Sequence, residues 1–218
     1  MAGTVAKQQP HVGMGGGGGG IRGGGYGDDG RGGGLPPGAA RRAYHTGMWL
    51  ALLAISMLFV AFTSAYIVRS GLGDDWQPIA LPPLVWWNTA LLILSSLTLE
   101  QTRRALNQGM REACNRWLAV TVLLGTGFLA GQILVWRQLV DLGIYVATNP
   151  SSSFFYLLTG AHGVHLLGGL AALLYIAVEA WRYRLGPAKR TLVEVTTLYW
   201  HFMDGLWVYI LLLIWLWR

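Results

Sequence analysis

Five long apolar segments determine what this chain can fold into, because each is close to or above the length that crosses a membrane as a helix. A helix rises about 1.5 Å per residue, so about 20 apolar residues cross about 30 Å of hydrocarbon. The second segment is the shortest, but Pro82 and Pro83 suit the first turn of a helix. The segments cover residues 46–68, 82–100, 116–138, 154–180 and 196–217. The sequence therefore predicts an all-α membrane protein, a bundle of five transmembrane helices.

The composition agrees with a membrane protein, since 53% of the 218 residues are hydrophobic and only 12% are charged. A net charge of +6 would suggest nucleic acid as a partner if the protein were soluble. Here the positions of the basic residues explain the charge without nucleic acid. They lie before the first segment, around the loop between the second and third, and between the fourth and fifth. The exceptions among the 16 Lys and Arg residues are Arg69, Arg137 and Arg218.

This distribution predicts the orientation of the chain, because Lys and Arg accumulate in cytoplasmic loops. We expect the N-terminus in the cytoplasm, the C-terminus in the periplasm, and a multi-pass protein of the bacterial inner membrane. We expect no nucleic-acid partner. The sequence contains one cysteine, Cys114, so it has neither an intrachain disulfide nor a CxxCH haem-attachment motif.

The N-terminal segment differs in composition from the rest of the chain. Residues 1–45 include a glycine tract with few apolar side chains, which predicts a disordered cytoplasmic tail. The segment has no apolar region typical of a cleavable secretory signal, so we expect the first span to act as an uncleaved signal anchor. Residues 46–218 then form the helical membrane domain.

Four ionisable residues lie inside the predicted spans and away from the span ends, where such groups are costly and are either functional or paired. His162 and His165 belong to the fourth segment, and His201 and Asp204 belong to the fifth. Each pair is spaced i, i+3 and so shares a helix face. Because a short loop joins the two segments, we expect antiparallel neighbours, between which a contact of an imidazole with the carboxylate is possible.

Three interpretations of these residues stay open on the pattern alone. The side chains can form interhelical hydrogen bonds that fix the packing of the bundle. They can ligate a haem or a metal, since histidine is a common axial ligand. They can also relay protons. The sequence contains no GxSxG, HExxH or GxxxxGK[ST] motif that would indicate a different membrane enzyme.

Other candidate residues lie near the ends of the spans or on small-residue faces. Glu194 lies near the basic side close to Arg190, which predicts a solvated ion pair at the interface. Arg69, at the outer end of the first span, is a candidate contact for a lipid phosphate. Gly127 and Gly131 form a GxxxG pair that favours close packing of helices.

The chain resembles subunit III of the haem-copper oxidases, the cytochrome c oxidase family. The TGxHGxH pattern of TGAHGVH and the YWHFxDxxW pattern of YWHFMDGLW carry the resemblance together with two earlier segments, in the order found in the family. The four similar segments are residues 47–68, 86–106, 154–170 and 198–217. Five spans match the short form of this subunit, which lacks the first two of seven helices.

The resemblance implies an accessory subunit of a proton-pumping terminal oxidase of aerobic respiration. In that family the haems and the copper lie in partner subunits I and II, so we expect no cofactor on this chain. The resemblance also implies packing against subunit I, bound phospholipid in a helix cleft, and support of proton uptake and of resistance to inactivation during turnover. His162, His165, His201 and Asp204 become structural or lipid-cleft residues.

One position departs from the family pattern, and two other functions compete with this interpretation. Ile55 stands where many members have a glutamate, so no role of that carboxylate transfers to this chain. One alternative is a small b-type membrane cytochrome with histidine ligands from the last two spans. The other is a small proton-coupled transporter, which the absence of internal repeats disfavours.

Overall fold

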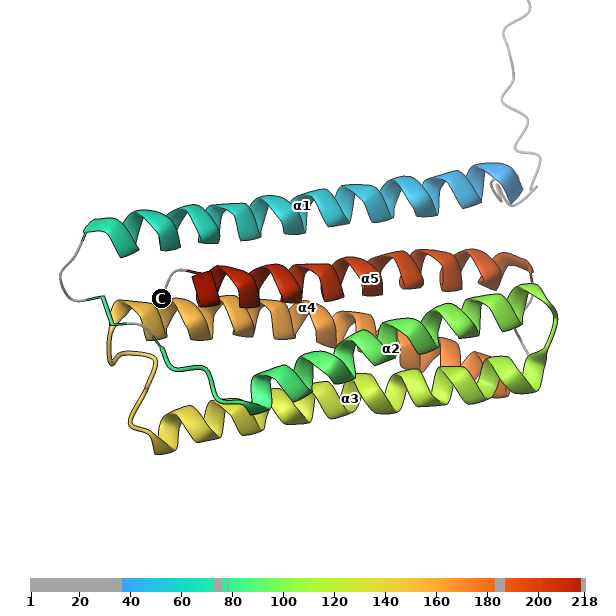
Figure 1. The fold of residues 1–218 in the computed structure, drawn as a ribbon. Helices are drawn as coiled ribbons and strands as arrows, with labels where there is room; N and C mark the ends of the chain where they lie inside the picture. The colour runs from blue at the N-terminus through green and yellow to red at the C-terminus, as the bar shows by residue number, and fades with distance from the viewer. Residues whose placement is uncertain (1–36, 73–75, 78, 183–186, 217–218) are drawn as a thin grey trace, which may run out of the picture. The chain divides into compact units, whose positions relative to one another are not determined.

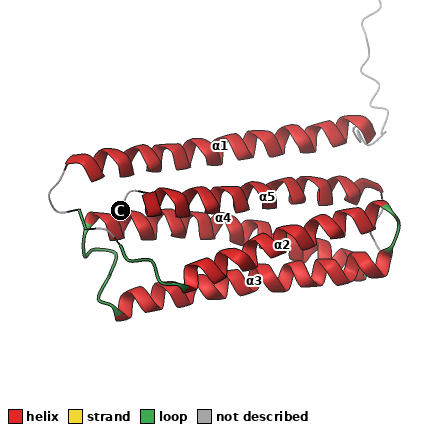
Figure 2. Ribbon diagram, viewed as in Figure 1, coloured by secondary structure: helices red, strands yellow, loops and turns green. Residues whose placement is uncertain are grey.

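The described part of the chain is helical throughout its regular elements. The computed structural model describes residues 37–72, 76, 77, 79–182 and 187–216, and these contain no strand. The helices are α1 (Pro37–Leu72), α2 (Leu84–Asn107), α3 (Arg111–Asp141), α4 (Pro150–Trp181) and α5 (Pro187–Leu216). Figure 2 shows the helices in red and the described loops in green. The predicted all-α class is thus confirmed for these residues.

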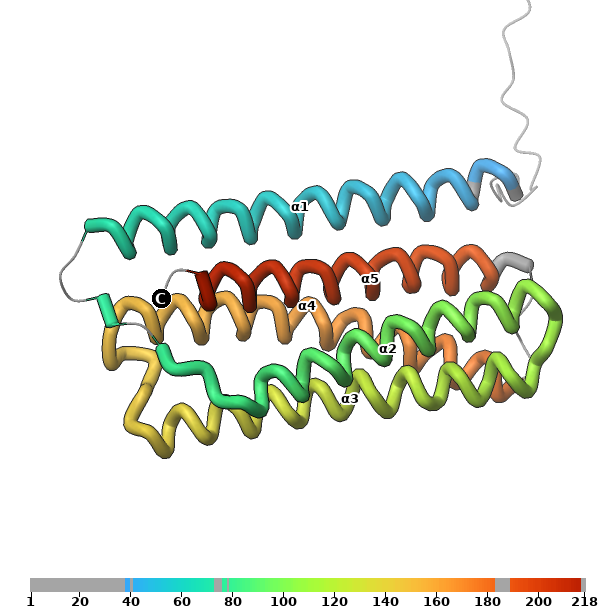
Figure 3. The backbone as a smooth tube through the Cα atoms, in the orientation of Figure 1, coloured from blue at the N-terminus to red at the C-terminus, as the bar shows by residue number. Residues whose placement is uncertain are grey.

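Four of the helices form a closed ring, and the fifth lies outside it. Helix α2 packs on α3, α3 on α4, α4 on α5, and α5 returns to α2. Helix α1 packs on α5 and, less extensively, on α4 (Figures 1 and 3). Since α5 contacts α1, α2 and α4, it is the helix on which the arrangement of the others most depends.

Four helices are long and apolar enough to cross a membrane, namely α1, α3, α4 and α5. Helix α2 is 24 residues long, so length is not what excludes it from this group. Its composition is more polar, because Asn88, Ser95 and Ser96 interrupt the apolar residues. The structure thus supports four spans by composition, and the passage of α2 through the bilayer stays a prediction.

The helices begin and end differently from the predicted spans, because helices continue beyond the apolar residues. Helix α1 begins at Pro37, so residues 37–45 are helical although they were assigned to the tail. Alanines and arginines in this stretch are good helix formers, and Arg41 reaches Glu194 of α5 at 3.1 Å. Helix α5 similarly begins at Pro187 instead of at residue 196. The predicted tail over residues 1–36 lies outside the described residues.

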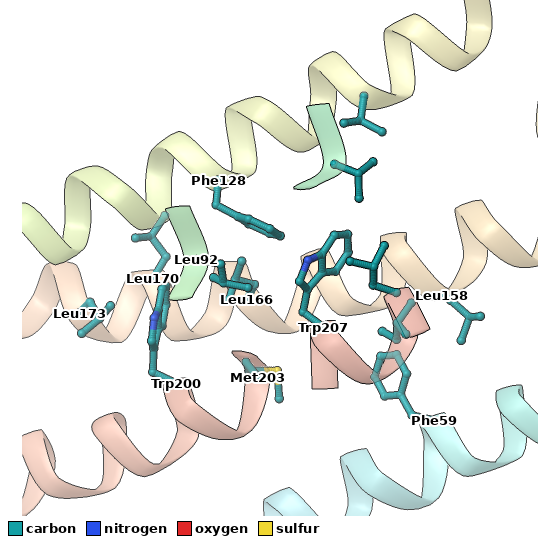
Figure 4. Close-up of a cluster of buried hydrophobic side chains, with 14 of the residues drawn as sticks. Phe59, Leu92, Phe128, Leu158, Leu166, Leu170, Leu173, Trp200, Met203 and Trp207 are labelled. Atoms are coloured by element: carbon teal, nitrogen blue, oxygen red, sulfur yellow. The ribbon is translucent and has the colours of Figure 1, made fainter. Parts of the chain in front are cut away.

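The centre of the ring is filled by two tryptophans of α5 (Figure 4). Trp200 is fully buried, and its indole Nε1 donates a hydrogen bond to Ser95 Oγ of α2 at 2.9 Å. Its ring also lies 3.0 Å from the ideal Cβ position of Gly125 in α3 and 3.2 Å from that of Gly169 in α4. Trp200 therefore contacts all three other helices of the ring, and glycine is needed where it meets α3 and α4.

Trp207 repeats this arrangement two turns further along α5. Its indole Nε1 donates a hydrogen bond to Thr89 Oγ1 of α2 at 3.0 Å. Its ring meets Phe128 of α3 edge to face, with 5.1 Å between the centroids. Because each indole N–H finds an acceptor, both large rings are buried without leaving a polar group unpaired.

Polar and aromatic contacts hold α1 against the ring at several levels. Arg41 pairs with Glu194 of α5 near one end of α1. Near the middle, Phe59 is only 1% exposed and packs against the core. Further along, Tyr209 of α5 donates a hydrogen bond to Thr63 Oγ1 at 3.0 Å. Helix α1 is therefore positioned along its length, although it lies outside the ring.

The two glycines of the GxxxG pair have different surroundings. A Cβ at Gly131 would lie 2.2 Å from Asn88 Oδ1 of α2, far inside van der Waals contact. Asn88 is held there by donating from Nδ2 to the backbone carbonyl of Phe128 at 3.0 Å. A Cβ at Gly127 would meet only Leu91 Cδ1, at 4.0 Å. Close approach of α2 and α3 thus requires glycine at Gly131 and leaves room at Gly127.

This difference predicts opposite effects of the same substitution. Gly131→Ala should lower the free energy of unfolding by about 1–3 kcal/mol, because Asn88 must move and lose its hydrogen bond. Gly127→Ala should leave it unchanged or raise it by up to about 1 kcal/mol, because alanine favours the helix. Titration with a denaturing detergent, followed by tryptophan fluorescence, measures both. Equal losses at the two positions would contradict the described packing of α2 on α3.

Candidate functional site

The first candidate residue, His162, is enclosed by aromatic rings inside the bundle. It is only 1% exposed. Its ring lies 5.3 Å from that of Trp207 and 6.3 Å from that of Phe128, measured between centroids. Neither ring nitrogen has a hydrogen-bond partner among the described residues. The imidazole therefore acts in this structure as a packing group between α3, α4 and α5.

His165, one turn further along α4, faces α1. Its Nδ1 lies 2.7 Å from the backbone oxygen of Ala161 in the preceding turn. Its ring meets Phe59 of α1 edge to face, with 6.0 Å between centroids. The hydroxyl of Tyr199 donates to the backbone oxygen of His165 at 2.8 Å, so this turn joins α4 to α5. These contacts link α1, α4 and α5.

His201 and Asp204 of α5 face α2 instead of α4. His201 Nδ1 forms a short hydrogen bond with Ser96 Oγ of α2, and the His201 side chain is otherwise exposed. Asp204 is only 7% exposed, both of its carboxyl oxygens are buried, and the Ser96 hydroxyl of α2 is the side-chain donor beside them. The two residues lie in one cleft of about 440 Å³ between α2 and α5.

The possible contact between an imidazole of α4 and the carboxylate of Asp204 is not formed among the described residues. The hydrogen bonds and ion pairs of the described residues include none between His162 or His165 and Asp204. The i, i+3 spacing does not give the rotation of a helix about its axis. Trp200 and Trp207 occupy the interior of the ring, so Asp204 is turned toward α2.

The carboxylates near the basic ends of the helices form ion pairs. Glu194 accepts from Arg41 at 3.1 Å, and His45 lies 3.6 Å away, so its partners belong to α1 rather than to the neighbouring Arg190. Glu100 accepts two hydrogen bonds from Arg103, each 2.9 Å long. The arginines of these pairs are partly exposed, with 62% of the Arg41 side chain and 43% of the Arg103 side chain accessible.

Two further pockets are open at the surface of the bundle. Arg69 lines an open cavity together with the loop that precedes α4, including Thr148 and Asn149. An apolar groove of about 570 Å³ runs between α3 and α4, and Gly127 belongs to its lining. Within the described ranges, three or more His, Cys, Asp or Glu side chains nowhere gather as they would around a metal ion.

Sequence reasoning missed the importance of Trp200 and Trp207. Most other tryptophans lie near helix ends and are exposed, as Trp87 at 74% and Trp181 at 69% show. Indoles at such positions anchor a protein in the headgroup region. Trp200 and Trp207 lie far from the ends of α5 and seven residues apart, which places both on one helix face. That spacing was the available signal for two central packing residues.

The helices, their apolar surfaces and the polar residues between them define an integral membrane protein with several helical spans. Comparison with known families then identifies the chain more closely. The family model described as cytochrome c oxidase subunit III matches residues 36–218, which include every helix. This chain belongs to that family and is a subunit of a haem-copper oxidase, hence part of a complex of several subunits.

The chain also aligns with individual relatives over most of its own length and most of theirs. The chain is 33% identical over 168 residues to a probable cytochrome c oxidase subunit 3 of Mycobacterium tuberculosis, covering 75% of this chain and 81% of that protein. It is 33% identical over 178 residues to cytochrome c oxidase subunit 3 of Synechocystis sp., covering 78% and 74%. It is 30% identical over 173 residues to a cytochrome bo(3) ubiquinol oxidase subunit 3 of Pseudomonas putida, covering 78% and 84%.

The packing of His162 predicts that its polar atoms contribute little to stability. His162→Leu should change the free energy of unfolding by less than about 1 kcal/mol, because no described hydrogen bond is lost and the volume is similar. Thr89→Val is the matched control and should cost about 1–3 kcal/mol, because it leaves the Trp207 N–H buried without an acceptor. Detergent-induced unfolding measures both. A large loss at His162 alone would show that its imidazole binds a further group.

Proposed function

We propose that this chain is an accessory subunit, without a redox centre of its own, of a proton-pumping terminal oxidase. It packs against subunit I, which carries the oxygen-reducing site, within a complex that also contains subunit II. The match of the family model to residues 36–218 carries this proposal, because it includes the complete helical domain. The chain stabilises subunit I and sustains its proton uptake, and electron transfer takes place elsewhere in the complex.

The surroundings of the histidines support a role without a cofactor. A bis-histidine haem needs two imidazoles on facing helices at matched depth with space for the haem between them. His162 is packed against Trp207 and Phe128, and His165 is directed to α1. His201 is bound to Ser96 on the α2 side of α5. The three imidazoles thus face three different neighbours, which supports structural roles.

The surface of the bundle supports bound phospholipid. The groove between α3 and α4 is lined by small and apolar side chains, which suits an acyl chain. At the end of α1, Arg69 lines a second open cavity beside Thr148 and Asn149, where a phosphate would meet cationic and polar groups. We infer that lipids occupy these surfaces and reduce the motion of subunit III against its neighbours.

The placement in the membrane completes the proposal. All five helices cross the bacterial inner membrane, α2 included, with the N-terminus in the cytoplasm and the C-terminus in the periplasm. Packing against α3 and α5 supports a membrane position for α2, because Asn88 Nδ2 and Ser95 Oγ donate hydrogen bonds to backbone oxygens inside the bundle. The relatives include subunits of cytochrome c oxidases and of a ubiquinol oxidase, so the electron donor of the whole complex is a separate question.

The accessory role predicts how the oxidase behaves without this chain. The complex lacking it should begin oxygen reduction at nearly the initial rate of the intact complex. It should then lose activity after severalfold fewer turnovers, because proton uptake in subunit I is no longer supported. An oxygen electrode measures both quantities on the two preparations. Equal lifetimes under continuous turnover would contradict the proposal.

The absence of haem ligands on this chain gives a separate prediction. His162→Leu, His165→Ala and His201→Ala variants of the complete oxidase should keep the reduced-minus-oxidised haem spectrum, in shape and in amount per subunit I. The spectra are recorded on purified complexes whose content of this chain is measured by mass spectrometry. Loss of a b-type band in one variant, with the chain still present, would favour the cytochrome alternative.

A further inference from the structure

A small polar cavity lies at the end of the bundle where α2 turns into α3, where α4 ends and where α5 begins (Figure 1). Its volume is about 180 Å³, several times the ~30 Å³ that one water molecule occupies in the liquid. Its polar side chains are those of Arg111, Asn115 and Arg190, and its described lining includes no Asp or Glu. The cavity is therefore a cationic space large enough for a small polar group.

The turn from α2 into α3 forms one wall of this cavity. Gly109 lines the cavity and has a φ of 73°, in the left-handed region that favours glycine. Helix α3 then begins at Arg111, and no side chain forms a hydrogen bond that caps its first turn. The backbone N–H groups of this turn border the cavity and add a partial positive charge to that of the arginines.

The two arginines of the cavity have no anionic partner among the described residues. Most carboxylates at this end of the bundle are already paired with other cations, as in Glu179 with Lys189, Glu100 with Arg103, and Glu194 with Arg41. Glu112 follows Arg111 in the chain but does not line the cavity. Arg111 and Arg190 thus border one small space without a counter-charge, and a bound anion would supply it.

The cavity adjoins the apolar groove between α3 and α4. Asn115 of the cavity and Ala119 of the groove lie one turn apart on the same face of α3, and Ala180 of the cavity precedes Trp181 of the groove. The exposed indole of Trp181 marks this end of the groove as the level of the lipid head groups. A cationic cavity at that level thus continues into a groove suited to acyl chains.

The groove itself offers no unpaired polar group to an acyl chain. Its hydroxyl-bearing lining residue, Thr126, donates to the backbone oxygen of Val122 in its own helix. The other described lining residues are small, aliphatic or aromatic. The cavity and the groove together therefore match the two parts of an anionic phospholipid.

We propose that this cavity binds a phosphate group, held by Arg111 and Arg190, with the Asn115 amide as a further donor. Guanidinium groups bind phosphate oxygens through paired hydrogen bonds. The adjoining groove favours the head group of an anionic phospholipid as the source of the phosphate, and a free phosphate ion is the other source. The lipid source rests on the proposed function, which places phospholipid in that groove, whereas the anion site requires only this chain.

Native mass spectrometry of the purified oxidase complex tests the site with two probes, dihexanoyl phosphatidylglycerol and inorganic phosphate. In the double variant Arg111→Gln, Arg190→Gln, one bound phosphatidylglycerol per complex should require at least about tenfold more lipid, because charge-assisted hydrogen bonds are lost. Arg116→Gln is the matched control and should bind as the wild type does, because Arg116 is also exposed on α3 but does not line the cavity.

The two probes separate the sources of the phosphate. A difference seen with inorganic phosphate and not with phosphatidylglycerol would confirm the anion site and overturn its lipid source. Equal binding of both probes by the wild type, the double variant and the control would overturn the site itself.

A further variant separates a built cavity from diffuse attraction of anions to basic residues. Ala180 lines the cavity and is only 4% exposed, so Ala180→Leu should fill part of the cavity while both arginines remain. Binding of phosphatidylglycerol should then weaken as it does in the double variant. Unchanged binding would show that the arginines act only as a charged surface, and would overturn the cavity as a site.

The anion site and the accessory role fail in distinguishable ways. If the variants purify with the haem-bearing subunit and bind both probes as the wild type does, the anion site is wrong and the accessory role stands. If no haem-bearing subunit purifies with the wild-type chain, the proposed function is wrong, and the two probes still test the anion site on the chain alone.

Discussion

The burial of the Trp200 indole at the centre of the ring is the contact on which the rest of the structure depends. Helices in a bilayer gain little from hiding apolar surface from lipid, so close packing and hydrogen bonds must hold them together. Trp200 supplies both: its ring fits against Gly125 and Gly169, and its N–H bonds to Ser95. Trp207 repeats the arrangement with Thr89 two turns away. Together they fix α5 against α2, α3 and α4.

The same two residues set the direction of the polar groups beside them. With the tryptophans inside the ring, His201 and Asp204 face α2, and His201 reaches Ser96. One short motif on α5 therefore serves two purposes. Its tryptophans assemble the ring, and its polar residues line the cleft beside α2. On the proposed function, the imidazoles and the carboxylate have structural roles within this subunit.

The helical class, the number of described helices and the family could be predicted from the sequence alone. The lengths of the apolar segments and the order of the short motifs can be read directly along the chain, without knowledge of the packing. Helix ends were less predictable: α1 begins at Pro37, since a helix continues through polar residues that contact a neighbour such as Glu194. Which neighbour each intramembrane residue meets could not be predicted at all. The i, i+3 spacing defines a helix face, whereas the rotation of α5 follows from three-dimensional packing around Trp200. For the same reason Gly127 and Gly131 looked equivalent and are not.

The central claim, an accessory subunit without its own redox centre, is tested most directly by purification through a tag on this chain in mild detergent. Mass spectrometry identifies the subunits that accompany it, and a reduced-minus-oxidised spectrum measures haem. The account predicts that a large haem-bearing subunit accompanies the chain and that the haem spectrum disappears once that subunit is stripped away. An isolated chain that retains a b-type spectrum with no partner would contradict it.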